Sequence, residues 1–473
     1  MLKLHEHLVT QARMPILMNL LYRRGRAMVF LLICTLAILV SPIMAVGLAT
    51  AEVQSITATH TYVMGDRDSK EDARAFCYMT AKRKALDKAG VLIESSTEIT
   101  NFKLSKDQIQ SYSAAILSVE IVREEFAFTN GVNTLTLTVT TKVDIENVRR
   151  RLTEIGSNKD LRAKVDAQQE QIRQLEMKLQ ELNQKLGGTS AGDEEQVRQD
   201  RDEGLLAYSR LGAERGEAVA QFYVGLSYAL GRGVPKDDAK AVAWYRKAAE
   251  QGLALAQAFL GAMYATGNGV PQDYTEAISW LRKAAEQGLA EAQFELGVAY
   301  YRGEGVPQDD VQAVAWYRKA AEQGLAAAET NLGWMYDQGR GIPQDDVQAV
   351  AWYRKAAEQG YALAQYKLAA KYAGGKGVLQ DERQAAAWVR KAADQGHADA
   401  QVFLGTMYGA GKGVPQDYGQ AHKWFNLAAA QGHKKGSELR DEVAKQLSPA
   451  QLAEAQRLAR EWTEAHEKSQ VKK

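Results

Sequence analysis

The sequence predicts a mostly α-helical protein: an α/α solenoid of helix-turn-helix repeats, preceded by a small α+β domain and a coiled-coil helix. Three observations support this prediction. A 36-residue unit recurs six times in the C-terminal half, with no insertion between copies. A heptad spacing of apolar residues precedes the repeats, and alternating polar and apolar residues near the N-terminus indicate strands. A fixed period of this size is typical of a solenoid, in which one unit cannot bury its apolar face alone.

The composition excludes several classes of protein. The 473 residues carry a formal net charge of +1 and are 25% charged, so we expect no basic surface for nucleic acid. Cys34 and Cys77 are the two cysteines, which is too few for a disulfide framework.

The first 51 residues have the parts of an export signal. A basic cluster at 23–26 precedes the apolar run Ala27–Val40, and a small-residue site ends at Ala51. This order predicts a secretory signal cleaved after Ala51, and therefore a location in the periplasm or cell envelope. The alternative is an uncleaved inner-membrane anchor, because 27–51 approaches spanning length.

Residues 52–156 predict a small α+β domain with an antiparallel sheet and helices on one face. Alternation, capping residues and breakers give these expected elements in order: a strand at Gln54–Met64, a helix at Lys70–Ala89 stopped by Gly90, a strand at Val91–Glu98, a helix at Ser105–Ala115, strands at Ile116–Phe128 and 132–143, and a short helix from Asp144 to about Arg151. Ser105 and Gln108 have the spacing of a capping box.

The stretch GDRDSKEDARAFCYMTAKRKALDKAG (65–90), followed by paired strands ending in KVD, resembles small domains of bacterial envelope proteins. The N-terminal domain of flagellar assembly protein T is one such domain. The resemblance implies a packing or adaptor module.

Residues 157–186 predict a coiled coil. Apolar residues follow a 4-3 spacing from Leu161 to Leu186, with Gln168 at one position. Such a narrow stripe needs a partner helix, so we expect self-association, as dimer or trimer. The seam residues assigned to this contact are Val165, Ile172, Leu175, Leu179 and Leu182. The alternative is a helix packed on its own chain. Residues 187–200 begin with a Gly-rich run and predict a flexible linker.

The repeats occupy 201–436, with a half-unit at 201–216, and capping helices follow at 437–473. Five of the six first helices carry an interior glycine, such as Gly225 and Gly333, which predicts close approach of another helix backbone. Each second helix starts at an aspartate N-cap. The capping residues are Asp237, Asp273, Asp309, Asp345, Asp381 and Asp417.

The recurrent residues A-x-A-Q, L-G-x-x-Y, G-x-G-V-P-x-D and A-x-x-W-Y-R-K-A-A-E-Q-G resemble the Sel-one-like repeat (SLR), a relative of the tetratricopeptide repeat. The resemblance implies an α/α solenoid that assembles other proteins. Repeat five departs from the pattern at Ala369 and Leu379, so we expect looser stacking there.

One tryptophan per repeat, spaced by 36 residues, is assigned to the core. These structural residues are Trp244, Trp280, Trp316, Trp352, Trp388 and Trp424.

The positions that vary between repeats are the candidates for binding. The central series on the first helices is Tyr223, Phe259, Glu295, Asn331, Lys367 and Phe403, flanked by residues four before and four after. We expect this stripe to line the concave wall and bind a protein or peptide segment. The alternative is ordinary packing between helices.

Three functions follow from these patterns. The first is a non-enzymatic exported scaffold for protein–protein interaction, multimerised by the coiled coil. The second is an envelope enzyme or peptidoglycan-related factor, but no nucleophile–base pair, paired acids or metal-ligand spacing is present. The third is a structural spacer. We expect no cofactor, no metal ion and no catalytic residue.

Overall fold

The computed structural model describes residues 53–64, 70–96, 104–129, 132–186 and 194–471. It divides into two compact bodies, an N-terminal body up to Gln272 and a C-terminal body from Asp273, which are described separately. The export signal or anchor at 1–51 lies outside the described residues. Within the described ranges no helix is long and apolar enough to cross a membrane.

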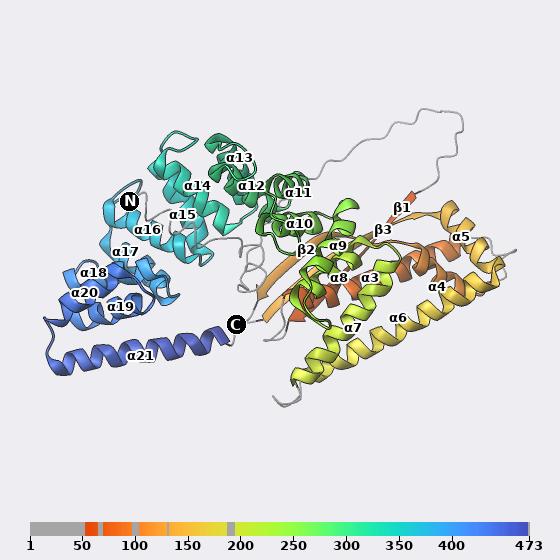
Figure 1. Cartoon of the computed structure of the whole chain (residues 1–473), viewed down its shortest axis with the longest axis horizontal. Coiled ribbons are helices and arrows are strands. Elements are labelled where there is room, and N and C mark those ends of the chain that lie inside the picture. The colour runs from red at the N-terminus through yellow and green to blue at the C-terminus, as the bar shows by residue number, and fades with distance from the viewer. Residues whose placement is uncertain (1–52, 65–69, 97–103, 130–131, 187–193, 472–473) are drawn as a thin grey trace. The chain divides into compact units, whose positions relative to one another are not determined.

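The N-terminal body contains the expected antiparallel sheet (Figure 1). Its strands are β1 (Val53–Met64), β2 (Glu120–Thr129) and β3 (Val132–Asp144), in the order β1-β3-β2. Helix α3 (Lys70–Ser96) packs against β1 and β3 through a buried face that includes Ala73, Cys77 and Ala81. Less exposed and more exposed side chains alternate along the strands, because one set faces α3 and the other faces solvent.

Two predictions for this domain are wrong. The strand expected at 91–98 does not form, because α3 continues through Gly90 to Ser96. Gly90 serves a close approach instead of a helix end: a Cβ there would stand 3.2 Å from the Cα of Gln110 in α4 (Lys106–Ile116). The last helix, α5 (Ile145–Ser157), extends beyond Arg151. The capping box of Ser105 and Gln108 is confirmed, with both hydrogen bonds formed.

The heptad helix is α6 (Lys159–Leu186), and it packs on α7 (Glu194–Glu214) of the same chain. Leu179 is fully buried in a cluster with Phe76 and Met79 of α3, and Leu182 is also buried. The alternative of packing on its own chain therefore holds for these two leucines. Val165, Ile172 and Leu175 are half-buried. Self-association of α6 stays a prediction.

Helix α7 starts at Glu194, so the flexible linker predicted for 187–200 is wrong for its last seven residues. The remainder, 187–193, lies outside the described residues.

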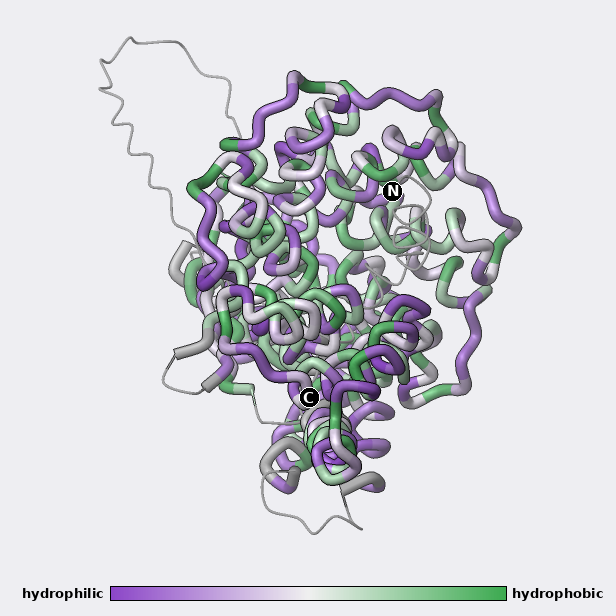
Figure 2. The backbone as a smooth tube through the Cα atoms, turned by 90° about the vertical axis from the view of Figure 1, so that its left-hand side faces the viewer, coloured by the Kyte–Doolittle hydropathy of each residue, from purple (hydrophilic) through white to green (hydrophobic). Residues whose placement is uncertain are grey.

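The repeats follow as helix pairs. The first helices are α8 (Ala218–Leu230), α10 (Ala254–Thr266), α12 (Ala290–Arg302), α14 (Ala326–Gln338), α16 (Ala362–Gly374) and α18 (Ala398–Ala410). The second helices are α9 (Asp238–Glu250), α11 (Tyr274–Glu286), α13 (Asp310–Glu322), α15 (Asp346–Glu358), α17 (Glu382–Asp394) and α19 (Tyr418–Ala430). Hydrophobic and hydrophilic positions alternate along them (Figure 2), as expected of helices with one buried face.

Both ends of these helices match the expected chemistry. In each second helix the aspartate side chain accepts a backbone N–H from the first turn, as Asp345 does from Gln348 at 3.0 Å. Each first helix ends on a glycine with positive φ, such as Gly339 at 65°. Only glycine adopts this conformation without strain.

The interior glycine of the first helix lies close to the backbone of the second helix, as expected, and it also faces an aromatic ring. A Cβ on Gly333 would stand 3.2 Å from the backbone carbonyl oxygen of Ala349. A Cβ on Gly297 would stand 2.5 Å from Cδ1 of Tyr317, in the second helix of the same repeat. In repeat five the alanine Ala369 accompanies the smaller Val389, and both are fully buried. The alanine methyl group fills only part of the space that a tyrosine ring would occupy, so the looser stacking expected there stays a prediction.

The tryptophans correct an expectation from the sequence. Trp424 is buried, but the other five are half-buried. A lysine three residues later lies over each of these five rings, as Lys319 does over Trp316 at 3.9 Å from the centroid. The fully buried position is the next residue, occupied by Tyr245, Tyr317 and Tyr353.

Successive repeats are joined by two recurrent polar contacts. Arg318 donates to the hydroxyl of Tyr336 at 3.0 Å, and Gln323 donates to Oε1 of Gln293 at 2.8 Å. After the last repeat come α20 (Lys434–Ala444) and α21 (Pro449–Val471). Helix α21 packs on α19, where Trp462 contacts the buried ring of Trp424. It therefore covers apolar surface that a further repeat would cover.

Candidate protein interface

The central stripe divides into buried and half-exposed members. Tyr223, Phe259 and Glu295 are buried, with 8%, 4% and 8% of their surface exposed. Phe259 packs edge-to-face on Phe222, with ring centroids 5.2 Å apart, and lies against Tyr245. For these three residues the structure favours the alternative interpretation, packing between helices.

The rest of the stripe, Asn331, Lys367 and Phe403, is half-buried in the C-terminal body. The flanking methionines four residues after the stripe are core residues: Met263, Met335 and Met407 are at most 5% exposed. An accessible surface on these helices must therefore include positions that the stripe omits.

One such group is centred on Arg340, in the loop after α14. The Arg340 guanidinium lies over the rings of Tyr301 and Trp334, at 4.7 and 5.7 Å from their centroids. The two rings meet edge-to-face at 5.5 Å. Asp310 holds the guanidinium through two hydrogen bonds of 2.9 and 3.0 Å. We call these four residues, Tyr301, Asp310, Trp334 and Arg340, the Arg340 cluster.

The Arg340 cluster is partly open to solvent and composed of residues that dominate binding energy in protein interfaces. Tyr301 and Trp334 are half-buried, and a third of the Arg340 side chain is exposed. Trp, Tyr and Arg are the residue types most enriched among interface hot spots. The bidentate contact with Asp310 fixes the guanidinium before any partner arrives, which lowers the entropy lost on binding.

The sequence did not lead us to Tyr301 and Trp334, although both differ from the residues at the same positions in the other repeats. Trp334 lies outside the 36-residue tryptophan series, and the other repeats have Leu, Ala, Val, Ala and Thr at its position. At the position of Tyr301 they have Ala, Asp or Gly. Aromatic residues found in single repeats are not required for stacking, so they were better candidates than the central stripe.

A charged group lies next along the first helices. Lys371 of α16 forms ion pairs with Asp337 of α14 and with Asp346, the latter at 2.6 Å. Burial opposes the charge of Lys371, but hydrogen bonds to both carboxylates raise its pKa. Burial lowers the pKa of the neighbouring Lys367. This group is a balanced structural network, because each charge has an opposite charge nearby.

At α18 the surface is aromatic again. The Tyr366 ring stacks on His397 at 5.3 Å and meets Phe403 edge-to-face at 6.2 Å. His433 Nε2 lies 3.1 Å from Oδ1 of Asp399. Burial lowers the pKa of His397, which favours the neutral ring in this stack.

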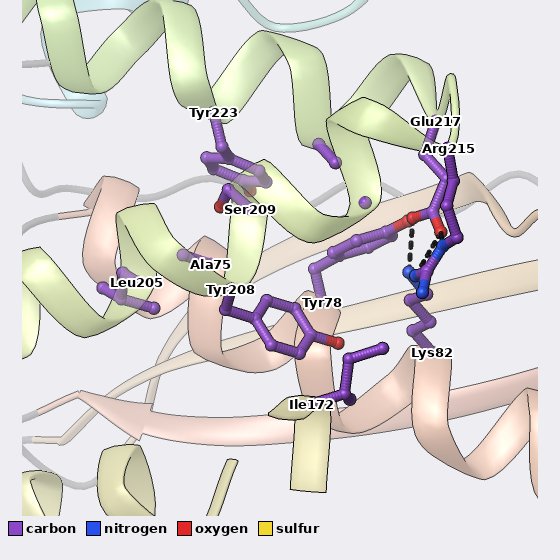
Figure 3. A pocket seen from close by; sticks show the side chains of 12 residues that line it. Ala75, Tyr78, Lys82, Ile172, Leu205, Tyr208, Ser209, Arg215, Glu217 and Tyr223 are labelled. Atoms are coloured by element: carbon purple, nitrogen blue, oxygen red, sulfur yellow. Dashed lines mark hydrogen bonds and ion pairs between the residues drawn. The ribbon is translucent and has the colours of Figure 1, made fainter. Parts of the chain in front are cut away.

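The N-terminal body contains a small cavity between α3, α6, α7 and α8 (Figure 3). Lys82 and Arg215 both pair with the Glu217 carboxylate, and Tyr78, Tyr208 and Tyr223 line the walls. Its volume of about 20 Å³ is room for about one water molecule. The cavity is therefore part of the packing between the α+β domain and the first repeat.

Two further features of the described residues bear on reactivity: groups that could bind a metal ion, and the thiol of Cys77. No group of three or more His, Cys, Asp or Glu side chains within them could hold a metal ion. Burial raises the pKa of the Cys77 thiol to about 11, so the thiolate needed of a nucleophile does not form at neutral pH.

The fold and the Arg340 cluster define an α/α repeat protein with a partly exposed aromatic and arginine surface on its first helices. The model of the Sel1 repeat family matches six consecutive stretches: 218–253, 254–289, 290–325, 326–361, 362–397 and 398–433. These stretches cover the repeats in the predicted register, and the chain belongs to the Sel1 repeat family.

Solved structures of this family resemble parts of the chain. A Sel1 repeat protein from Oxalobacter formigenes is 35% identical over 48% of this chain and 92% of its own, with a TM-score of 0.46. A protective antigen of uropathogenic Escherichia coli with an SLR fold is 28% identical over 62% and 96%, with a TM-score of 0.31. A Sel1 repeat protein from Klebsiella pneumoniae is 26% identical over 43% and 99%, with a TM-score of 0.30. No functionally curated protein matches the chain.

Sel1 repeat proteins are generally scaffolds that bind other proteins, and they are typically non-catalytic.

Proposed function

We infer that this protein is an exported scaffold of the bacterial cell envelope, which holds a partner protein along its first helices in the C-terminal body. The observation that carries the proposal is the Arg340 cluster, where two half-exposed rings and a fixed guanidinium meet. Tyr366 and Phe403 extend the aromatic surface two repeats further. A partner that contacts both places would follow the first helices from α12 to α18.

The binding surface is tested by a photo-reactive amino acid placed at Trp334 in the living cell. We expect one discrete cross-linked product, which is lost when Arg340→Ala is added. The matched control carries the same group at Val347, which is 62% exposed on α15 and outside the cluster. Equal products at both positions, or none at Trp334, would favour the structural spacer.

Export rests on the order of residues 23–51 alone, so it needs its own measurement. Alkaline phosphatase fused after the last repeat is active only outside the cytoplasm, and we expect activity. Sequencing of the purified N-terminus separates the two signal types. A chain that begins at Glu52 indicates cleavage, whereas a retained 27–51 segment indicates an anchor. An inactive fusion would exclude export.

If α6 joins copies of the chain, we expect the contact to involve its first two thirds, where Val165, Ile172 and Leu175 are half-buried. Leu179 and Leu182 are occupied within the chain. If this part of α6 contacts a second helix, Ile172→Glu should reduce the molecular mass in solution. An unchanged mass would show that α6 does not join copies.

A further inference from the structure

Strand β1 lies at an edge of the sheet, because β3 is its hydrogen-bonded neighbour on one side and no other described strand pairs with it. All 12 residues of β1 pair with β3 in one continuous register, without a bulge. The strand contains no Pro, Lys, Arg, Asp or Glu. A long, regular and uncharged edge strand can pair with another strand through its backbone.

The opposite edge differs. Strand β2 has an irregular register between Ile121 and Arg123, and it carries charged residues at Glu120, Arg123 and Glu125. Bulges and charges are the means by which proteins protect sheet edges from pairing. One edge of this sheet is thus protected and the other is not.

The exposed face of β1 is symmetric about Ala58. Its residues read Val53, Ser55, Thr57, then Thr59, Thr61, Val63, all of them exposed. An antiparallel pair of two β1 strands centred on Ala58 would place Val opposite Val, Ser opposite Thr, and Thr opposite Thr. A two-fold symmetric interface requires this kind of self-complementarity.

We propose that β1 is a homodimerisation edge, at which a second copy of this chain adds antiparallel about Ala58 and joins two three-stranded sheets into one of six strands. The strand that pairs with β1 is a second copy of β1, because its side-chain pattern is symmetric. Pairing with an unrelated strand would not require this symmetry. Opposed threonines are already paired within the sheet, where Thr59 and Thr138 hydroxyls are 3.0 Å apart and Thr61 and Thr136 hydroxyls 2.8 Å. The same pairing repeats across the new edge.

The neighbouring contacts leave this edge accessible. Ala58 is buried on the other face of β1, where α3 covers it, so the helix layer does not occupy the threonine face. Lys88 of α3 donates to the carbonyl of Thr57 at 3.2 Å, and its long exposed side chain can leave this position for solvent. The proposal does not depend on α6 or on the binding surface of the repeats.

Light scattering of the full chain, purified in a mild detergent whose mass is subtracted, tests the proposal. We expect about twice the mass of the purified chain, which is 52.1 kDa if residues 1–51 are retained. The double variant Thr57→Lys and Thr59→Lys sets two ammonium groups of each copy against two of the other, and the mass should halve. The matched control Val122→Lys adds a lysine at a residue of β2 that is 61% exposed, and should keep the dimer.

A charge-exchange experiment separates a lost contact from a misfolded chain. The variant Thr57→Glu with Thr59→Glu should also be monomeric, and mixing it with the double lysine variant should restore the dimer. A monomeric wild-type chain at ~100 µM would overturn the proposal. A dimer that survives the double lysine substitution would also overturn the proposal. If Ile172→Glu converts that surviving dimer to a monomer, the contact would be assigned to α6.

Discussion

The ring of Tyr353 occupies the place where a side chain on Gly333 would begin: a Cβ at Gly333 would stand 2.9 Å from Cδ1 of that ring. The two residues belong to the first and second helices of the same repeat, and their sizes are matched. The same match recurs at Gly225 with Tyr245 and at Gly405 with Phe425.

The substitution Gly333→Ala tests this match. Alanine favours a helix over glycine by about 1 kcal/mol, but overpacking a core costs about 1–3 kcal/mol. We expect net destabilisation of about 1 kcal/mol in chemical unfolding. Adding Tyr353→Val reproduces the natural pair Ala369 and Val389 and removes the clash, so the double variant should be less destabilised than the sum of the two single variants. If the Gly333→Ala variant is more stable than wild type, the ring does not exclude the methyl group.

Glu329 makes stability depend on pH. In the other five repeats the same position is a glutamine, such as Gln365, which donates to a backbone carbonyl at 3.1 Å. Glu329 is 3% exposed, and burial raises its pKa to about 7. Because the folded-state pKa lies above the unfolded value, stability is full below about pH 4.5 and declines as the pH rises to 7. The raised pKa of Glu329 corresponds to a loss of at most about 3 kcal/mol in the free energy of unfolding.

The variant Glu329→Gln should therefore stabilise the protein above pH 7 and leave it nearly unchanged at pH 4.5, as measured by melting temperature. Gln365→Glu is the reciprocal control, and should introduce the same loss one repeat later. Equal effects at both pH values would contradict the assignment. Burial also raises the pKa of Glu295 to about 7, so part of the wild-type pH dependence remains in Glu329→Gln.

The buried ion pair of Lys82 and Glu217 predicts a strong asymmetry between single and double variants. Their side chains are 5% and 8% exposed. Lys82→Met leaves the carboxylate with Arg215 alone, and breaking a buried pair costs about 3–5 kcal/mol. Lys82→Met with Glu217→Gln should restore part of the stability. Arg173→Ala removes a pair with Glu170 whose side chains are 63% and 46% exposed, and should leave stability nearly unchanged.

The C-terminal cap predicts a further loss of stability. Trp462 of α21 contacts the buried Trp424, so Trp462→Ala should expose apolar surface of α19. We expect destabilisation of about 2 kcal/mol, lower than for a fully buried tryptophan because Trp462 is half-buried. Arg457→Ala on the exposed side of α21 is the control. A melting temperature equal to wild type would show that α21 does not stabilise the last repeat.

The sequence was sufficient for features that repeat. Period, aspartate caps and positive-φ glycines are local, so each recurs wherever its residues recur. The predictions were wrong where one residue type can serve either of two structural roles. Gly90 was interpreted as a helix stop but permits the approach of α4. The recurrence of Trp316 predicts a core residue, whereas the buried side chain is that of Tyr317 next to it.

The candidate site was less predictable, because it arises from contacts between different repeats. Arg340 reaches Tyr301, 39 residues earlier, and Asp310, 30 residues earlier. Superposing the repeats shows which positions vary, but not which varying side chains meet. The heptad spacing has a similar limit: it indicates that α6 needs an apolar partner but not which one, and for Leu179 the partner is α3 and α7 of the same chain.

The size match between Gly333 and Tyr353 limits how this array can change its length. Successive repeats contact each other through the same arginine–tyrosine pair, so duplication or loss of a whole 36-residue segment keeps this pair at the new junction. A recombination breakpoint between the two helices of a repeat is different. It could join a first helix with alanine to a second helix with tyrosine, which would clash, or glycine to valine, which would leave a void. Gene rearrangements that survive should therefore break at the end of a second helix.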